Sequence, residues 1–99
     1  MKVFQHLDDI DFVRAVEHRS RDGNALAQVF AQFEIAQMYA IGAGVSRNEA
    51  EAFYWLKVSS EQGNPEAQKM LGDFYSVGRG VGTDTAEAVR WWRRAAAQG

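Results

Sequence analysis

The apolar positions of this chain recur at helical spacing and fall on one side of each predicted helix. Over residues 49–61, and again over 85–97, small and aromatic side chains lie three or four positions apart, which is the spacing of one helix face. Residues 9–22 carry a broader apolar face behind an acidic first turn, which suits the positive end of the helix dipole. Helices at residues 25–41 and 65–77 complete the pattern, so the sequence predicts an all-α chain of about five helices.

The second half of this pattern copies the first. The stretch from Gln37 to Gly63 returns from Asp73 to Gly99 at a constant step of 36 positions. The identical pairs include Tyr39/Tyr75, Gly42/Gly78, Gly44/Gly80, Val45/Val81, Ala50/Ala86, Ala52/Ala88, Trp55/Trp91, Gln62/Gln98 and Gly63/Gly99. So many identities at one offset indicate a tandem repeat. We divide the chain into three parts within one structural domain. Residues 1–23 form a tail and the degenerate second helix of a partial repeat, and two repeats follow at 24–63 and 64–99.

Glycines and cap residues predict where the helices end and begin. Gly23-Asn24 and Gly63-Asn64-Pro65 each combine a left-handed terminator with an N-cap, and Pro65 occupies the first helical position, where no N–H is needed. Asn48 and Asp84 are predicted N-caps with a glutamate three residues on, the spacing of a capping box in which both partners accept a backbone N–H. Antiparallel helix pairs joined by such short glycine loops give a right-handed α-α solenoid.

The run from Ala67 to Gly99 resembles the Sel-one-like repeat (SLR) family, a branch of the tetratricopeptide-type (TPR-like) helical repeats. It has the pattern Ala-x3-Leu-Gly-x2-Tyr-x2-Gly-x-Gly-Val-x2-Asp-x3-Ala-x2-Trp-Trp-x2-Ala-Ala-x-Gln-Gly. The run from Ala31 to Gly63 matches in the same register, with Ala36, Asn48 and Leu56 at the positions of Gly72, Asp84 and Trp92. The resemblance implies a non-catalytic scaffold or adaptor for protein–protein interaction, as in bacterial signalling, secretion or envelope assembly and in eukaryotic quality-control complexes.

Charge and cysteine content narrow the expected partners and location. A formal charge of −2 over 99 residues argues against general affinity for nucleic acid or anionic membranes. The absence of cysteine excludes the relatives whose repeats are stapled by disulfides, and it fits a reducing compartment. No stretch has the features of a signal peptide or a membrane span. We therefore expect a cytoplasmic protein.

Residues with the potential for chemistry have a simpler structural explanation. The glycines of Gly78-x-Gly80-x-Gly82 follow a helix and lack the lysine of a P-loop, so a turn explains them better than a phosphate site. The acidic run at residues 8–11 lacks the remaining ligands of a calcium loop, and the two histidines, His6 and His18, have no partner spacing for metal or acid–base work. We expect no catalytic residue, metal or cofactor.

Two clusters of side chains leave an alternative function open. Arg90, Arg93 and Arg94 share a face of the last helix, and together with the glycine loops they could serve a regulatory small-molecule or nucleotide-binding module. A solvated face is the interpretation we favour, because an arginine three residues after Glu87 can pair with it and positive charge suits a helix C-terminus. Trp55, Trp91 and Trp92 could form a stacking platform, but at helical spacing we expect Trp55 and Trp91 in the core.

Positions where the two copies disagree are the candidates for partner binding. Four extra residues precede Ala31 and lengthen the first helix by about one turn. Apolar residues there face polar counterparts, because Phe30 aligns with Glu66 and Phe33 with Lys69. Either the N-terminal segment around Val3, Phe4 and Leu7 covers them, or they form a partner groove. The candidate partner surface is Leu26, Phe30, Phe33, Glu34 and Met70.

The C-terminal edge is a second candidate surface. In a longer array the next helix would pack on the open side of residues 85–97. Val89, Trp92 and Ala96 share that side. We expect either that the chain is a fragment of a longer array or that it forms a homodimer through this edge.

Overall fold

The computed structural model describes residues 25–98, and side chains from Val29 onward. This part of the chain contains four helices: α2 (Ala25–Ile41), α3 (Glu49–Glu61), α4 (Pro65–Val77) and α5 (Thr85–Gln98). The predicted bounds are confirmed for the first three helices, and α5 extends one residue beyond the predicted end. The predicted helix at residues 9–22, the Gly23-Asn24 junction and the N-terminal segment lie outside the described residues.

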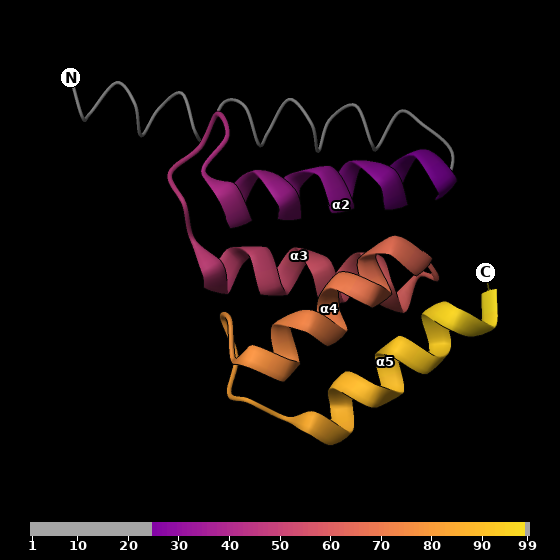
Figure 1. The fold of residues 1–99 in the computed structure, drawn as a ribbon. Helices are drawn as coiled ribbons and strands as arrows, with labels where there is room; N and C mark the ends of the chain where they lie inside the picture. The colour runs from indigo at the N-terminus through magenta and orange to yellow at the C-terminus, as the bar shows by residue number, and fades with distance from the viewer. Residues whose placement is uncertain (1–24, 99) are drawn as a thin grey trace.

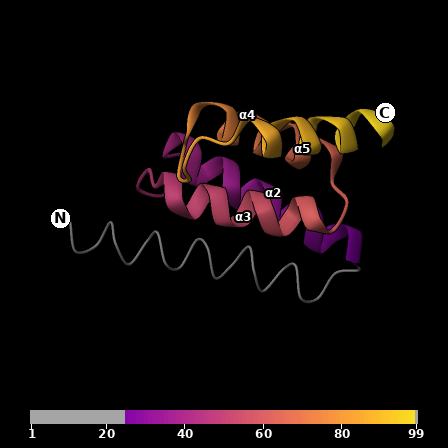
Figure 2. The ribbon, with the colours of Figure 1, turned by 90° about the horizontal axis from the view of Figure 1, so that it is seen from below.

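The four helices form a right-handed solenoid of antiparallel pairs. Each helix packs on the next in the chain, α2 on α3, α3 on α4 and α4 on α5. Figure 1 shows the two helices of each pair running in opposite directions, and Figure 2 shows α4 and α5 as a layer against α2 and α3. The expected all-α solenoid is therefore confirmed.

One core runs continuously through all four helices. Its buried members are Ala36 and Ala40 of α2, Ala52 and Leu56 of α3, Ala67, Leu71, Phe74 and Tyr75 of α4, and Ala88 and Trp91 of α5. Half of them are alanines, which let the helix backbones approach closely, and each fully buried large side chain stabilises the fold by about 1.5–3 kcal/mol. Trp91 is buried as expected, whereas Trp55 is half-buried and packs against this core from its edge.

The two helix-to-helix turns repeat the same backbone hydrogen bonds. Gly42 N–H donates to Met38 O at 2.7 Å, and Gly78 N–H donates to Phe74 O at 2.8 Å. Both glycines have φ near +75°, the left-handed conformation that residues with a Cβ avoid. The ends of these two helices are therefore determined locally, by a glycine that the sequence places at each C-terminus.

The predicted capping boxes form only in part. Asn48 and Asp84 accept from the backbone N–H of Glu51 and Glu87, each at 3.1 Å, as expected. The return bond, in which the glutamate side chain would accept the N-cap backbone N–H, is replaced. Asn48 N–H instead donates to Tyr39 O, and its counterpart Asp84 N–H donates to Tyr75 O, both at 2.9 Å. The N-cap amide therefore fastens the turn to the preceding helix.

Candidate functional site

The predicted partner surface divides into a packed part and an outward part. Phe33 and Met70 are half-buried and pack against the main core, so the fold itself accounts for much of their apolar character. Phe30 is 56% exposed and Glu34 is also exposed. The side chain of Leu26 lies outside the described residues. Among the described members, Phe30 is therefore the large apolar side chain presented to solvent.

Two exposed apolar residues escaped the comparison of the two repeats. Ile41 is 74% exposed and Val77 is 66% exposed. They stand at equivalent positions, at the ends of α2 and α4, one period apart. The position is apolar in both repeats, so comparing the repeats does not single it out. The remaining signal in the sequence is the burial expected of a residue in the last turn of a helix. Together with Phe30, they are exposed apolar side chains on the first helix of each pair, and we call these three residues the exposed apolar margin.

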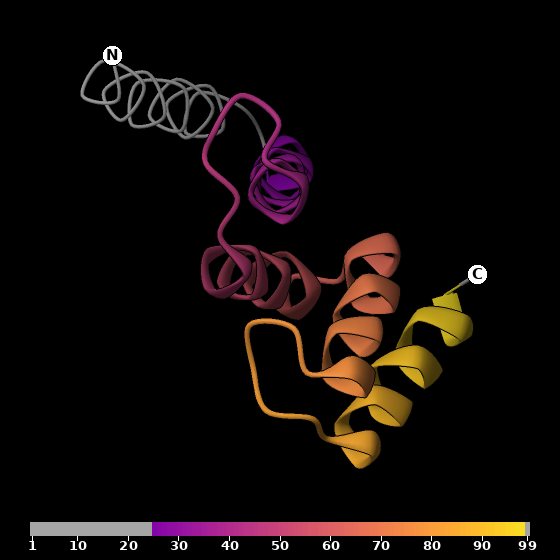
Figure 3. The ribbon, with the colours of Figure 1, turned by 60° about the vertical axis from the view of Figure 1, so that its left-hand side comes forward.

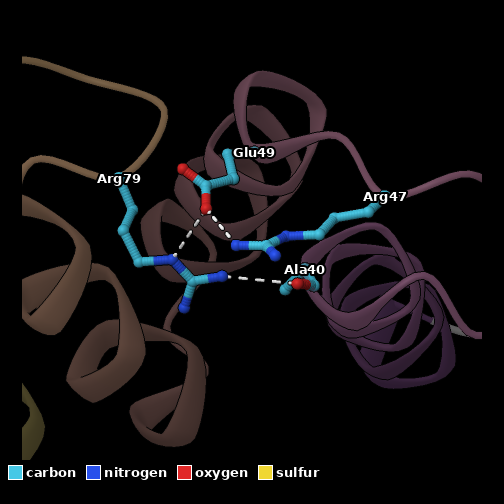
Figure 4. Close-up of polar contacts among 4 residues, drawn as sticks. All are labelled: Ala40, Arg47, Glu49 and Arg79. Carbon is cyan, nitrogen blue, oxygen red and sulfur yellow. Dashed lines mark hydrogen bonds and ion pairs between the residues drawn. The ribbon is translucent and has the colours of Figure 1, made fainter.

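A polar cluster ties the second glycine loop to the first repeat. Arg79 donates from Nε to Glu49 Oε1 at 3.4 Å and from Nη2 to Ala40 O at 3.3 Å (Figure 4). Its guanidinium also lies 4.4 Å from the centre of the Phe74 ring. On the other side of the same carboxylate, Arg47 donates to Glu49 Oε1 at 2.6 Å (Figure 4). Arg79 therefore serves the junction between repeats.

The Glu49 carboxylate responds to this surrounding charge. The hydrogen bond from Arg47 is the largest influence and lowers the pKa of Glu49 below 4.5; the nearby charge of Arg79 lowers it further, against some desolvation. Tyr75, which is buried nearby in the core, has its pKa raised above 10.0, chiefly by desolvation and also by the charges of Glu87 and Asp84. Both groups are held in their ordinary ionisation state at neutral pH, which fits a structural role.

The C-terminal arginines and the glycine loop have structural partners as well. Arg90 pairs with Glu87 at 3.0 Å, as predicted, and the Arg94 guanidinium lies 4.4 Å from the centre of the Trp91 ring. Gly80, with φ of +66°, sits against α3 so closely that a Cβ would overlap the Glu49 carbonyl oxygen. A turn and a close helix contact thus account for this glycine without a phosphate.

A groove lies between α4 and α5 on the described part of the surface. It encloses about 560 Å³ and is lined by Pro65, Glu66, Lys69 and Asp73 of α4 and by Trp92, Ala95 and Ala96 of α5. We call it the terminal groove. Two of the three residues predicted for the C-terminal edge, Trp92 and Ala96, line it, and the third, Val89, is half-buried nearby on α5.

The Trp92 side chain is held in place on the floor of the terminal groove. Its Nε1 donates to Asp73 Oδ1 at 3.0 Å. Its ring lies directly on Gly72, where a Cβ would overlap the indole. The apolar face of the groove is therefore preformed.

Within residues 25–98 the structure holds no group of three or more potential metal ligands. None of the described helices is both long and apolar enough to cross a membrane.

The family model described as "Sel1 repeat" matches residues 29–64 and 65–99. A Sel1 repeat protein from Oxalobacter formigenes is 33% identical, with a TM-score of 0.78, over 93% of this chain and 25% of that one. Protective antigen c5321 of uropathogenic Escherichia coli, which displays an SLR fold, is 33% identical with a TM-score of 0.77, over 88% of this chain and 18% of that one. No curated protein matches.

Proposed function

Because this chain belongs to the Sel1 repeat family, we propose that it acts as a non-catalytic protein–protein interaction scaffold or adaptor. Proteins of this family are generally interaction scaffolds. The chain spans a quarter or less of the length of each of the two solved relatives named above. The proposal therefore concerns the binding role of this repeat unit.

The observation that carries the proposal is the exposed apolar margin on the first helix of each pair. Phe30, Ile41 and Val77 each leave more than half of the side chain in water, at 56%, 74% and 66%. Covering such side chains stabilises a complex by about 25 cal/mol per Å² of apolar surface, before the cost of association. Aromatic anchors are common among the residues that dominate binding.

We place the partner surface around Phe30. Glu34 lies one turn further along α2 and is exposed, so it can add a polar contact at the rim. Phe33 and Met70 both pack on the core, so the fold holds their side chains in place within this surface. Leu26 belongs to the same face by its spacing, one turn before Phe30.

The test is affinity capture of partners from the source cell with three forms of the chain. Phe30→Ser removes the aromatic anchor, and Tyr54→Ser is the matched control, because Tyr54 on α3 is equally exposed at 57%. We expect at least one protein to be captured by the wild-type chain and by Tyr54→Ser, and to be lost with Phe30→Ser. Equal capture by all three forms would contradict the placement at Phe30.

The nucleotide-binding alternative has a direct test. A thermal-shift screen of the chain with nucleotides and divalent metals should leave the melting temperature unchanged, because Gly80, Arg79 and Arg90 already have partners within the fold. A saturable rise with one nucleotide, lost on Arg93→Ala, would support the alternative instead.

A further inference from the structure

The outer face of α5 carries three arginines within five positions. Arg90, Arg93 and Arg94 have the spacing of one helix face, and all three are exposed. α5 packs on α4, which lies between it and α3 (Figure 3). The three arginines and single glutamate of α5 give this helix a formal charge of +2, whereas the whole chain has a charge of −2. Positive charge is therefore concentrated on one face of a molecule that is acidic as a whole.

The counterpart of this face stays exposed when another repeat follows it. One period earlier, on α3, Tyr54 and Lys57 stand at the positions of Arg90 and Arg93. Both are exposed, although α4 and α5 come after them in the array. A further repeat packed after α5 would therefore leave Arg90 and Arg93 in contact with water.

The fold does not require a cation at each of these positions. In the first repeat Tyr54 and Val58 stand at the positions of Arg90 and Arg94. Tyr54 packs edge-on against Trp55, with 5.3 Å between the ring centres. The first repeat thus builds the same helix pair with neutral side chains at these two positions, so packing alone does not explain the arginines.

Two of the three guanidinium groups are held in place by α5 itself. Arg90 donates from Nη1 to Glu87 Oε1 at 3.0 Å, and the Arg94 guanidinium lies 4.4 Å from the centre of the Trp91 ring. The Arg90 side chain is still 73% exposed, so its other N–H donors face water. Arg93 makes no hydrogen bond or ion pair with another described residue. Because two of the groups are already placed, a ligand that binds them loses less side-chain entropy.

We propose that the outer face of α5 binds an acidic segment of a partner protein in an extended conformation. The planar guanidinium group of arginine forms paired hydrogen bonds with carboxylates. Arg90 and Arg94 are one turn apart, about 6 Å along the helix axis, and alternate side chains of an extended chain are about 6.6 Å apart. Carboxylates at alternate positions of the segment therefore meet these two arginines, and Arg93 is available to a further carboxylate.

The surroundings of the arginines favour a peptide over a nucleotide. None of the three lines the terminal groove, and Trp91, the aromatic ring beside them, is only 6% exposed. A base would therefore have neither that groove nor an open ring to stack on at this face. Carboxylates along an extended chain need only exposed donors. This face is also separate from the surface around Phe30, which belongs to α2.

The test is a titration of the full chain into a labelled peptide of four Glu-Ser units, followed by fluorescence anisotropy. A peptide of four Gln-Ser units is the neutral control. We expect saturable binding of the acidic peptide only. The affinity should fall at least fivefold when the salt concentration rises from about 50 to about 300 mM, because salt screens exposed charges.

Matched charge reversals locate the binding site. Arg93→Glu changes a side chain of the proposed face, and Lys57→Glu makes the same change at the equivalent exposed position of α3. At about 100 mM salt, which screens charges more than about 10 Å apart, the first variant should weaken binding at least tenfold and the second less than twofold. Both positions are exposed, so each variant should keep the melting temperature of the wild type within a few degrees. Phe30→Ser should bind the peptide like the wild type, which separates this site from the surface proposed above.

Absence of binding at low salt would overturn the proposal. Equal weakening by Arg93→Glu and Lys57→Glu would also overturn it, since the peptide would then be attracted by charge without a defined site. Displacement of the peptide by a micromolar nucleotide would assign the arginines to the nucleotide-binding alternative instead. A dimer in sedimentation that Arg93→Glu dissociates would place the acidic α3 of a second copy on this face.

Discussion

In the first repeat Ala36 and Leu56 belong to the same core between the helices, and in the second Gly72 and Trp92 stand at the same two positions. The larger side chain on the second helix is matched by the smaller residue on the first. Trp92 lies where the Cβ of an alanine at position 72 would be. The two repeats thus fill the same space in two different ways.

The hydrogen bonds at the turns and helix ends of the two repeats, in contrast, are nearly identical. The N-cap amides of Asn48 and Asp84 donate to Tyr39 O and Tyr75 O, each at 2.9 Å. Gln62 donates to Gln32 Oε1 at 2.8 Å, and its counterpart Gln98 donates to Gln68 Oε1 at 2.6 Å. These hydrogen bonds are thus kept in both repeats, whereas the packing between the paired helices changes at two positions together.

The largest effect should follow from disturbing the shared turn. Gly80→Ala would place a Cβ on the Glu49 carbonyl and in a left-handed conformation, so we expect a loss of about 2–4 kcal/mol in the free energy of unfolding. Urea unfolding followed by circular dichroism measures it. Gly82→Ala is the control, since nothing lies within 4 Å of its added Cβ, and it should change stability by less than about 0.5 kcal/mol. Equal effects would refute the close contact.

A double-mutant cycle tests the compensating pair. Gly72→Ala should cost about 1–3 kcal/mol because the methyl group overlaps the Trp92 ring, less the gain of about 0.5–1 kcal/mol for alanine in a helix. Trp92→Leu alone should cost about 1 kcal/mol through the lost bond to Asp73. Together they recreate the pairing of the first repeat.

The coupling between the two changes decides the outcome. The double variant should be more stable than the sum of the single losses predicts, by at least about 1 kcal/mol, as equilibrium urea unfolding can resolve. Additive losses would mean that the two positions adapt independently and that the compensation inferred from the two repeats is coincidental.

The smallest effect concerns the two arginines that bind Glu49, Arg47 and Arg79. Arg79 stands where the first repeat has Ala43. The lowered pKa of Glu49 means that its contribution to stability is present above pH 4.5 and is lost as the pH falls through the pKa of the folded state. Melting temperatures measured over the acid range should therefore fall less steeply in Arg47→Ala than in the wild type. Arg79→Ala should flatten the profile less, because the Arg47 bond has the largest influence. The reverse order would contradict this assignment.

The helix bounds were predictable because their causes are local. The glycine and N-cap residues at Gly63, Asn64 and Pro65 stop one helix and start the next within three positions, and the turn at Gly78 needs no distant contact. The same holds for the Glu87–Arg90 pair, which lies within a single helix.

Contacts over long sequence distances were not predictable from pattern alone. Phe33 differs from its polar counterpart Lys69 because it packs on a core to which α4 contributes, which neither position reveals by itself. Arg79 reaches back to Ala40 across 39 positions, and no spacing rule connects them. Of the residues that line the terminal groove, the sequence predicted only Trp92 and Ala96. The lining residues on α4 could not be predicted, because they depend on how α4 and α5 cross.

The length of α2 shows where an array of this kind tolerates insertion. α2 has 17 residues and α4 has 13, yet their turns carry the same hydrogen bonds at the far end. Four residues advance a helix by about 400°, so an added turn returns the side chains to within about 40° of their original direction. Insertions and deletions in natural variants of this repeat should therefore gather at the N-terminal end of the first helix of each pair, in whole turns, while the loop from Gly78 to Asp84 keeps its length.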